Sequence, residues 1–229
     1  MKTVIISGAN GNLGGAVTKA FLDKNYRVVA IVSNENAKKD FQQHPNLDIA
    51  AVNLINEKET TDFIENTIRH YGVIDAALLL VGGFAMGGLD ETTGDDLRKQ
   101  IALNFETAYY ITRPLFNHLM KNKCGTIVFI GARPSLNPAQ GKGLIAYSLS
   151  KSLLFKLAEL LNETAKGENI SVSVVVPSTL DTPLNRKSMP EVNPDIWVKP
   201  AEIAEVLEFL VSDKAKALKE TVLKIYNKA

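Results

Sequence analysis

The chain has 229 residues, with 26 Lys and Arg against 25 Asp and Glu, which gives a formal net charge of +1 at pH 7. Hydrophobic residues at 45% and charged residues at 22% are typical of a folded globular protein and exclude a disordered chain. The near-zero charge gives no electrostatic reason to expect nucleic acid or an acidic membrane as a partner, and a single cysteine excludes an internal disulfide framework.

Short apolar, β-branched runs alternate with helical patterns along the chain. The runs, each predicted to be a strand, cover residues 4–6, 28–32, 49–52, 74–80, 126–130, 172–176 and 222–226. The helical patterns cover residues 13–24, 57–71, 95–121, 145–166 and 201–211. Most runs are continuously apolar, as in parallel strands that helices cover on both faces. The order predicts an α/β protein with three layers, a doubly wound parallel sheet of about seven strands of the Rossmann type.

No repeat or linker divides the sequence, so residues 1–229 are expected to form one domain that includes a short substrate loop at 178–199. No apolar run reaches the roughly 18–20 residues of a membrane helix, and the first residues lack the pattern of a signal peptide. We therefore expect a cytoplasmic protein with no membrane partner. The three histidines have no partner at metal-ligand spacing, so no metal site is expected.

A glycine-rich turn follows the first predicted strand and opens the first predicted helix. Glycine permits a tight turn and leaves room for a pyrophosphate, while the helix N-terminus supplies free N–H groups and a positive dipole. A purely structural turn is the alternative. We expect a dinucleotide site here, formed by Ser7, Gly8, Asn10, Gly11, Asn12, Leu13 and Gly14.

The end of the second predicted strand bears on the form of the dinucleotide. An acidic residue about 20 positions beyond the turn usually binds the adenosine ribose of NAD and repels a 2′-phosphate. Here that position falls on Val32 or Ser33, and the nearest cations are Lys38 and Lys39. The sequence leaves NADH and NADPH open with a slight preference for NADPH, and it adds Ser33 and Asn34 to the expected cofactor-binding residues.

Tyr147 and Lys151 stand four residues apart at the start of the long helical pattern, and so they share one helix face. A tyrosine has an ordinary pKa of about 10, and a nearby ammonium group favours the phenolate. We therefore expect Lys151 to lower the pKa of Tyr147 towards neutral pH, as acid–base catalysis requires. Without the glycine turn, the same spacing would indicate only a surface contact.

These features resemble the short-chain dehydrogenase/reductase family. The turn is similar to its T-G-x-x-x-G-x-G motif, with Ser7 in place of the threonine and Asn12 in place of the middle glycine. Tyr147 and Lys151 match its Y-x-x-x-K motif, and Asn104 matches a helix asparagine that supports a proton-relay water in this family. The resemblance implies an NAD(P)-dependent oxidoreductase with Tyr147, Lys151 and Asn104 as catalytic residues.

One family position differs. Members of this family carry a serine at the end of the fifth strand, where this chain has Ala132. Ser135 lies close by, and the sequence leaves open whether it replaces that serine.

Three segments resemble the dihydropteridine reductases in particular. Residues 180–190 are similar to their L-D-T-P-x-N-R-K-S-M-P run, 80–88 to their A-G-G-W-A-G-G loop with Phe84 for tryptophan, and 131–133 to an A-G-A-K segment. The resemblance implies hydride transfer to a quinonoid dihydropterin, with a proton from Tyr147, to give a tetrahydropterin. It implies cofactor contacts from Gly82, Gly83, Tyr147, Lys151, Pro177, Thr179 and Thr182, and substrate contacts from Phe84, Arg133 and Asn185.

Two other functions stay open: a carbonyl or alcohol oxidoreductase with another small substrate, and a non-catalytic NAD(P)-binding sensor. Intact Tyr147, Lys151 and Asn104 argue against the sensor, and the run at 180–190 argues against another substrate. This family pairs subunits through the helices that hold these residues, so the resemblance also implies a dimer or a tetramer.

Overall fold

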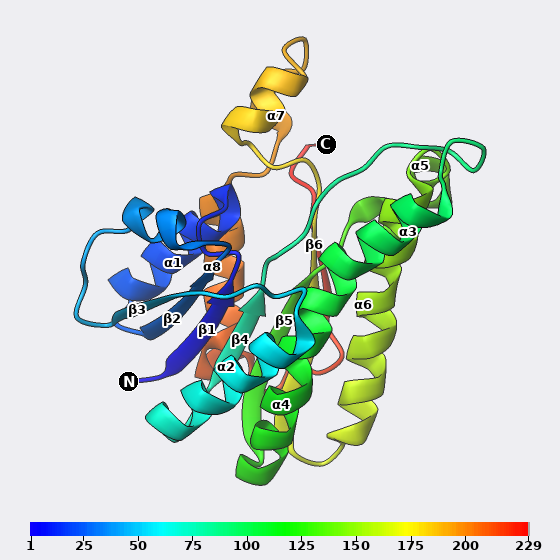
Figure 1. Cartoon of the computed structure of the whole chain (residues 1–229). Helices are drawn as coiled ribbons and strands as arrows, with labels where there is room; N and C mark the ends of the chain where they lie inside the picture. Colours follow the sequence, from blue (N-terminus) through cyan, green and yellow to red (C-terminus); the bar gives the residue numbers. More distant parts are fainter. Residues whose placement is uncertain (229) are drawn as a thin grey trace.

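The computed structural model describes residues 1–228, and at its centre is a seven-stranded sheet in the order β3-β2-β1-β4-β5-β6-β7 (Figure 1). Every pair of neighbouring strands is parallel. The strands are β1 (Thr3–Ser7), β2 (Arg27–Val32), β3 (Leu47–Ala51), β4 (Ala76–Leu79), β5 (Cys124–Ile130), β6 (Asn169–Pro177) and β7 (Val222–Ile225). The predicted doubly wound α/β fold is confirmed.

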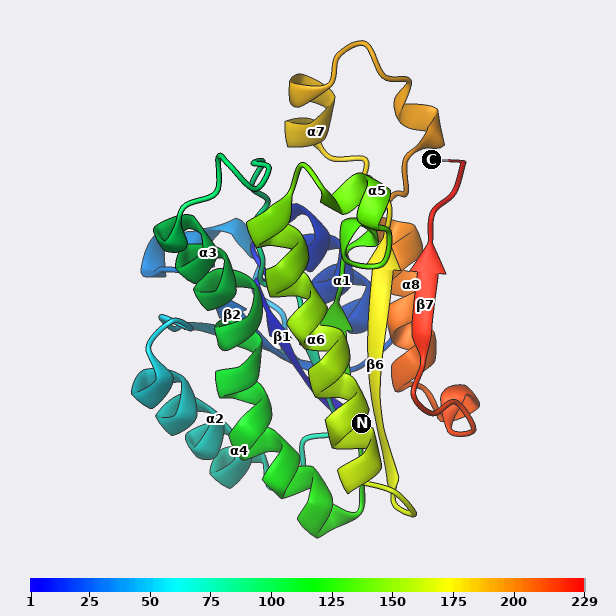
Figure 2. The ribbon, with the colours of Figure 1, turned by 90° about the vertical axis from the view of Figure 1, so that its right-hand side faces the viewer.

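Helices cover both faces of the sheet and make three layers (Figures 1 and 2). One face carries α1 (Asn12–Asp23) and α8 (Pro200–Val211), and the other carries α2 (Glu57–Tyr71), α4 (Thr107–Asn122) and α6 (Ile145–Thr164). The shorter helices are α3 (Gly94–Ile101), α5 (Pro138–Gly141) and α7 (Pro183–Ser188). Short 3-10 helices lie at Glu35–Asp40, Arg133–Ser135, Pro194–Ile196 and Asp213–Ala215.

Alternate strand residues serve opposite layers. In β1, Val4 and Ile6 belong to the apolar cluster that contains Phe21 of α1, whereas Ile5 belongs to the cluster that contains Ile111 of α4. Successive side chains of a strand point to opposite faces, and here both faces are covered. A strand in this sheet must therefore be apolar at every position, which is the pattern that predicted it.

Polar contacts also join the layer of α1 and α8. The carboxylate of Glu208 in α8 accepts hydrogen bonds from Lys24 Nζ at 2.5 Å and from the Tyr26 hydroxyl at 3.0 Å. Lys2 Nζ donates to the carbonyl of Val211 at 2.8 Å. The residues that follow α1 are thereby fastened to a helix that lies 184 residues later in the sequence.

The helix predicted over 95–121 is not continuous, which corrects that expectation. α3 begins after Thr93, whose side chain accepts a hydrogen bond from the backbone N–H of Asp96 in a capping box. A π-helical turn over Ala102–Glu106 then separates α3 from α4. Such turns insert an extra residue into a helix and are frequent at functional sites, and this one contains Asn104.

The order of the strands reverses at β1, which pairs with β2 on one side and with β4 on the other. Ser7, the last residue of β1, is level with Ile31 and Leu79. Because the sheet is parallel, the loops after these strands leave the same edge, and in doubly wound sheets ligands bind there. In Figure 1, α7 projects beyond this edge.

Candidate active site

The glycine turn after β1 packs so tightly that two of its glycines cannot be replaced easily. Gly8 has a φ of +67°, in the left-handed region. A Cβ atom on Gly14 would lie 2.1 Å from the carbonyl oxygen of Gly8. Gly11 is the N-cap of α1, and within the described chain no side chain caps this helix start. Its first N–H groups therefore stay available for an anionic ligand such as a pyrophosphate.

A pocket of about 330 Å³ lies beside this turn. Five of the residues predicted to bind a cofactor line this pocket: Gly8, Asn10, Gly11, Ser33 and Gly82. It is also lined by residues that were not predicted, among them Asn53, Leu54 and Ile55 after β3, and Leu103 and Thr107 around the π-helical turn. The loop after β3 leaves the same edge of the sheet, so the predicted topology alone could have identified it.

Ser7 does not line this pocket, although it was predicted among the cofactor-binding residues. Its side chain is buried, and its Oγ accepts a hydrogen bond from the backbone N–H of Leu80 at 3.1 Å. Ser7 therefore connects the ends of β1 and β4 and influences the site by holding the two loops together.

The end of β2 presents polar groups, with no carboxylate at positions 32–34. Ser33 and Asn34 are exposed, and Asn34 donates from Nδ2 to the hydroxyl of Ser33 at 3.1 Å. The Oδ1 atom of Asn34 accepts from the N–H of Ala37 and caps the turn that follows. Lys38, a nearby cation, forms an ion pair with Glu35 at 2.8 Å.

Asn104 is fully buried and joins three parts of the site. Its Oδ1 accepts from the N–H of Gly83 at 2.8 Å. Its Nδ2 lies within donating distance of the carbonyl of Gly83 at 3.0 Å, Gln100 Oε1 at 2.9 Å and Ser150 Oγ at 3.0 Å. The loop after β4, the π-helical turn and the start of α6 thus meet at one amide.

Lys151 is buried directly beside this amide. Its Nζ donates to the carbonyl of Ile130, the last residue of β5, at 2.8 Å. A Cβ atom on Gly82 would lie 2.8 Å from both Lys151 Nζ and Asn104 Oδ1, so only glycine leaves both side chains in place. Burial lowers the pKa of Lys151 to about 8.

Tyr147 lies one helical turn before Lys151, and its ring contacts Phe84. The two ring centroids are 5.2 Å apart and the planes are inclined by 69°. Burial raises the pKa of Tyr147 to about 12. The expectation that Lys151 lowers this pKa is therefore wrong, because loss of solvent disfavours the phenolate here, and Tyr147 is a protonated donor at neutral pH.

Ser135, the candidate replacement for the missing family serine, forms a hydrogen bond within the protein. Ala132 is buried at the end of β5. The hydroxyl of Ser135 donates to the backbone carbonyl of Ser148 at 3.0 Å, so it braces the start of α6.

The loop after β6 uses several predicted site residues to form its own structure. The hydroxyl of Thr182 accepts from the N–H of Asn185 at 3.2 Å and caps α7. Asn185 Nδ2 donates to the carbonyl of Leu180 at 2.8 Å. Thr179 accepts at its carbonyl from the N–H of Val198, which closes the base of the loop.

Arg133, which was predicted to bind substrate, lies over the ring of Tyr226 with 4.6 Å between its Cζ and the ring centroid. The carbonyl of Tyr226 accepts from the hydroxyl of Ser178, next to Pro177. Tyr226, the residue after β7, therefore connects Arg133 with the loop after β6.

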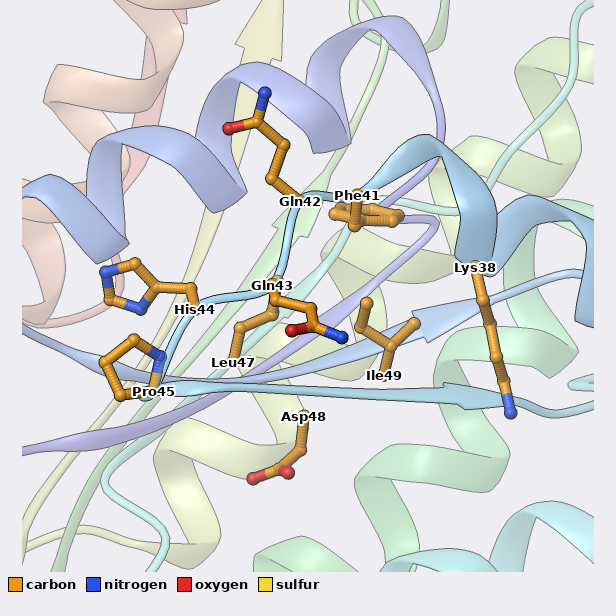
Figure 3. Close-up of a pocket in the computed structure, with 9 residues that line it drawn as sticks. All are labelled: Lys38, Phe41, Gln42, Gln43, His44, Pro45, Leu47, Asp48 and Ile49. Carbon is orange, nitrogen blue, oxygen red and sulfur yellow. The ribbon is translucent and has the colours of Figure 1, made fainter.

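A larger hollow of about 750 Å³ lies elsewhere, along the edge strand β3 (Figure 3). In Figure 3, His44 and Lys38 mark its two ends. Over residues 1–228, none of the predicted site residues contributes to its lining, which consists of Lys38, Phe41, Gln42, Gln43, His44, Pro45, Leu47, Asp48 and Ile49. Asn104, Tyr147 and Lys151, the residues predicted to be catalytic, are not among those that line this hollow.

Within the described residues, two kinds of feature are absent. None of the helices within 1–228 combines the length and the apolar character needed to cross a membrane. Within the same range, His, Cys, Asp and Glu side chains form no group of three suited to a metal ion.

The chain is similar to one protein family and to several known reductases. The family model described as short chain dehydrogenase matches residues 2–193. Dihydropteridine reductase of Dictyostelium discoideum is 28% identical over 213 residues, which cover 90% of this chain and 86% of the relative. Acetoacetyl-CoA reductase of an Acinetobacter strain is 25% identical over 228 residues, which cover 93% and 91% of the two chains.

Among solved structures, one titled "ElxO with NADP Bound" superimposes with a TM-score of 0.91 at 22% identity. The match covers 98% of this chain and 96% of that one. An oxidoreductase from Burkholderia thailandensis gives a TM-score of 0.85 at 22% identity and covers 99% of this chain and 91% of that one. These structural likenesses support the doubly wound fold.

Proposed function

Since the chain belongs to the short-chain dehydrogenase family and is an oxidoreductase, we propose that it is an NAD(P)H-dependent reductase whose substrate is a quinonoid dihydropterin. One observation carries the choice of substrate. Phe84 packs against Tyr147 with the ring planes inclined by 69° and is 63% exposed, so its ring is accessible for stacking against a flat heterocycle beside the phenol. The dihydropteridine reductase relative, which covers most of both chains, supports the same choice.

The residues around the glycine turn fit a dinucleotide. The free N–H groups at the start of α1 suit a pyrophosphate, and the pocket between β2 and the loop after β3 suits an adenosine. The exposed hydroxyl of Ser33 and the absence of a carboxylate at 32–34 favour NADPH over NADH. NAD(P)H held by these residues would supply the hydride.

The residues of the chain supply the proton and the geometry. Tyr147 has a pKa of about 12, remains protonated at neutral pH and donates its phenolic proton to the substrate. Hydride and proton together reduce the substrate by two electrons, and solvent restores the proton of Tyr147. Lys151, whose Nζ donates to the carbonyl of Ile130 and lies next to Gly82, follows Tyr147 by one helical turn and holds its ammonium group in the site.

Ala132 bears on the kind of substrate. Without the family serine, Tyr147 is the proposed hydroxyl donor towards a developing negative charge, which suits a substrate that accepts hydride readily. A carbonyl substrate is the second candidate, and its support is the acetoacetyl-CoA reductase relative.

The test is turnover of a quinonoid dihydropterin, followed as loss of NADPH or NADH absorbance above the non-enzymatic rate. We expect acceleration with NADPH, and Tyr147→Phe should lower it by about 100-fold without weakening NADPH binding. Absence of acceleration with both cofactors refutes the pterin assignment, and turnover of acetoacetyl-CoA in its place supports the carbonyl alternative.

We also propose that a second copy of the chain covers the outer face of α6. Leu149, Leu153 and Leu160 lie on one side of this helix and remain exposed at 50%, 37% and 60%. Analytical ultracentrifugation should show a dimer or tetramer, and Leu153→Asp with Leu160→Asp should dissociate it. A monomer in the unmodified protein would exclude this assembly.

A further inference from the structure

We propose that Ser150 is a positioning residue, which fixes the start of α6, and with it Tyr147, relative to Asn104. This inference rests on the proposed reductase function. Ser150 lies between Tyr147 and Lys151 in one helical turn and is fully buried. It is distinct from the catalytic groups because its hydroxyl contacts only Asn104 and a backbone carbonyl.

The direction of the hydrogen bonds at Ser150 is fixed. Its Oγ donates to the backbone carbonyl of Tyr147 at 2.8 Å and lies 3.0 Å from Asn104 Nδ2. A hydroxyl has one hydrogen, so Oγ must accept from Asn104 while it donates to Tyr147. The result is a chain of polarised bonds from Asn104 through Ser150 to the backbone of Tyr147.

The amide nitrogen of Asn104 faces more hydrogen-bond acceptors than it has hydrogens to donate. Its orientation is set by Gly83, whose N–H donates to Oδ1. Nδ2 carries two hydrogens but faces three acceptors, on Gly83, Gln100 and Ser150. Loss of the Ser150 hydroxyl therefore leaves two acceptors for two hydrogens, and the amide stays satisfied.

The number of acceptors left for Asn104 Nδ2 distinguishes a positioning role of Ser150 from a structural one. Removing the hydroxyl breaks the link between α6 and the π-helical turn but strands no buried donor, so the fold should tolerate it. The link matters for the reaction because α6 carries both Tyr147 and Lys151. A small displacement of catalytic groups is enough to lower turnover by one or two orders of magnitude.

The first test compares Ser150→Ala with Ser152→Ala. Ser152 is a matched control, because its Oγ donates to the carbonyl of Leu149 at 2.7 Å with the same spacing of three residues, but this hydrogen bond is exposed and Ser152 is only partly buried. We expect Ser150→Ala to lower kcat by about tenfold with the KM and the NADPH affinity unchanged, and Ser152→Ala to change none of them. Equal kcat values for the two variants would overturn the positioning role.

The second test needs no activity and uses the shared acceptors. Ser150→Ala and Gln100→Met should each shift the urea midpoint only slightly, because either remaining acceptor satisfies Asn104 together with Gly83. The double variant leaves one acceptor for two hydrogens and should shift the midpoint by more than the sum of the single shifts. Additive shifts would show that Ser150 does not share the Asn104 amide and would overturn the inference.

The two tests also separate this inference from the proposed function. A wild-type chain that does not reduce the pterin refutes the function, while the unfolding data still report on the hydrogen-bond network. A wild-type chain that does reduce it, with Ser150→Ala as active as Ser152→Ala, refutes the inference alone.

Discussion

Replacing Gly14 by alanine should disable the glycine turn, whereas the same change at the neighbouring Gly15 should not. A Cβ on Gly14 would lie 2.1 Å from Gly8 O and 2.7 Å from the Cα of Ala9, and real Cβ atoms essentially never approach closer than 3.0 Å. On Gly15 the nearest atom, the oxygen of Ala9, is 3.9 Å away. The atoms that oppose Gly14 belong to the backbone, so no side-chain rotation relieves the overlap.

The magnitude follows from how far the turn must move. To reach an allowed contact, the carbonyl of Gly8 must retreat by about 1 Å, and overpacking of this kind costs about 1–3 kcal/mol or more. Alanine in a helix also gains about 1 kcal/mol over glycine, and this gain applies at both positions. We therefore expect Gly15→Ala to be neutral or stabilising and Gly14→Ala to be about 3 kcal/mol less stable than Gly15→Ala.

Two measurements check this prediction. The emission of Trp197, the only tryptophan of the chain and a buried one, reports urea unfolding. Titration with NADPH measures how well the turn still binds the cofactor. A loss of about 3 kcal/mol in the binding free energy at the pyrophosphate corresponds to about 150-fold weaker binding. The steric reasoning is refuted if both variants have the same unfolding free energy and bind NADPH within about threefold of each other.

Three further predictions concern single side chains. Displacing the pKa of Lys151 from 10.5 to about 8 disfavours its charged form by about 3 kcal/mol, so its contribution to stability is lost as the pH falls from 10.5 to 8. Lys151→Met should abolish turnover, yet at pH 7 it should unfold at a higher urea concentration than the wild type. The difference between the two urea midpoints should shrink towards pH 10. An equal difference at both pH values would contradict the burial of Lys151. Ala132→Ser should change pterin turnover by less than about threefold, because the quinonoid substrate needs little oxyanion assistance, and a large rise would count against that reasoning. Ser33→Asp should weaken NADPH binding by about tenfold or more relative to NADH, as measured by parallel titrations, since a carboxylate repels the 2′-phosphate; an unchanged ratio would place the phosphate elsewhere.

The layered fold could be predicted from the sequence because helices on both faces require strands that are apolar throughout. Val4, Ile5 and Ile6 already carry that information, since each faces one of two apolar layers. The break between α3 and α4 could not be predicted in the same way. A π-helical turn has no local composition that distinguishes it from an α-helix, and Asn104 occupies it because of partners at Gly83 and Ser150, far away in the sequence.

The candidate site could be predicted as a set of positions, but the chemical state of its groups could not. The spacing of Tyr147 and Lys151 places them on one helix face, yet burial raises one pKa and lowers the other. Motifs likewise identify Ser7 and Asn185 without showing that their side chains bond to Leu80 and Leu180. Such partners depend on packing between distant segments, which no local pattern encodes.

The packing of α8 against α1 has a consequence for folding during synthesis of the chain. The glycine turn and α1 leave the ribosome early, but the helix that covers α1 and holds Lys24 and Tyr26 through Glu208 is synthesised about 180 residues later. Until then the apolar side of α1, including Phe21, has no cover on its outer flank. A nascent chain can therefore form β1 and β2 early, but it acquires a nucleotide-binding half of full stability only at the end of translation.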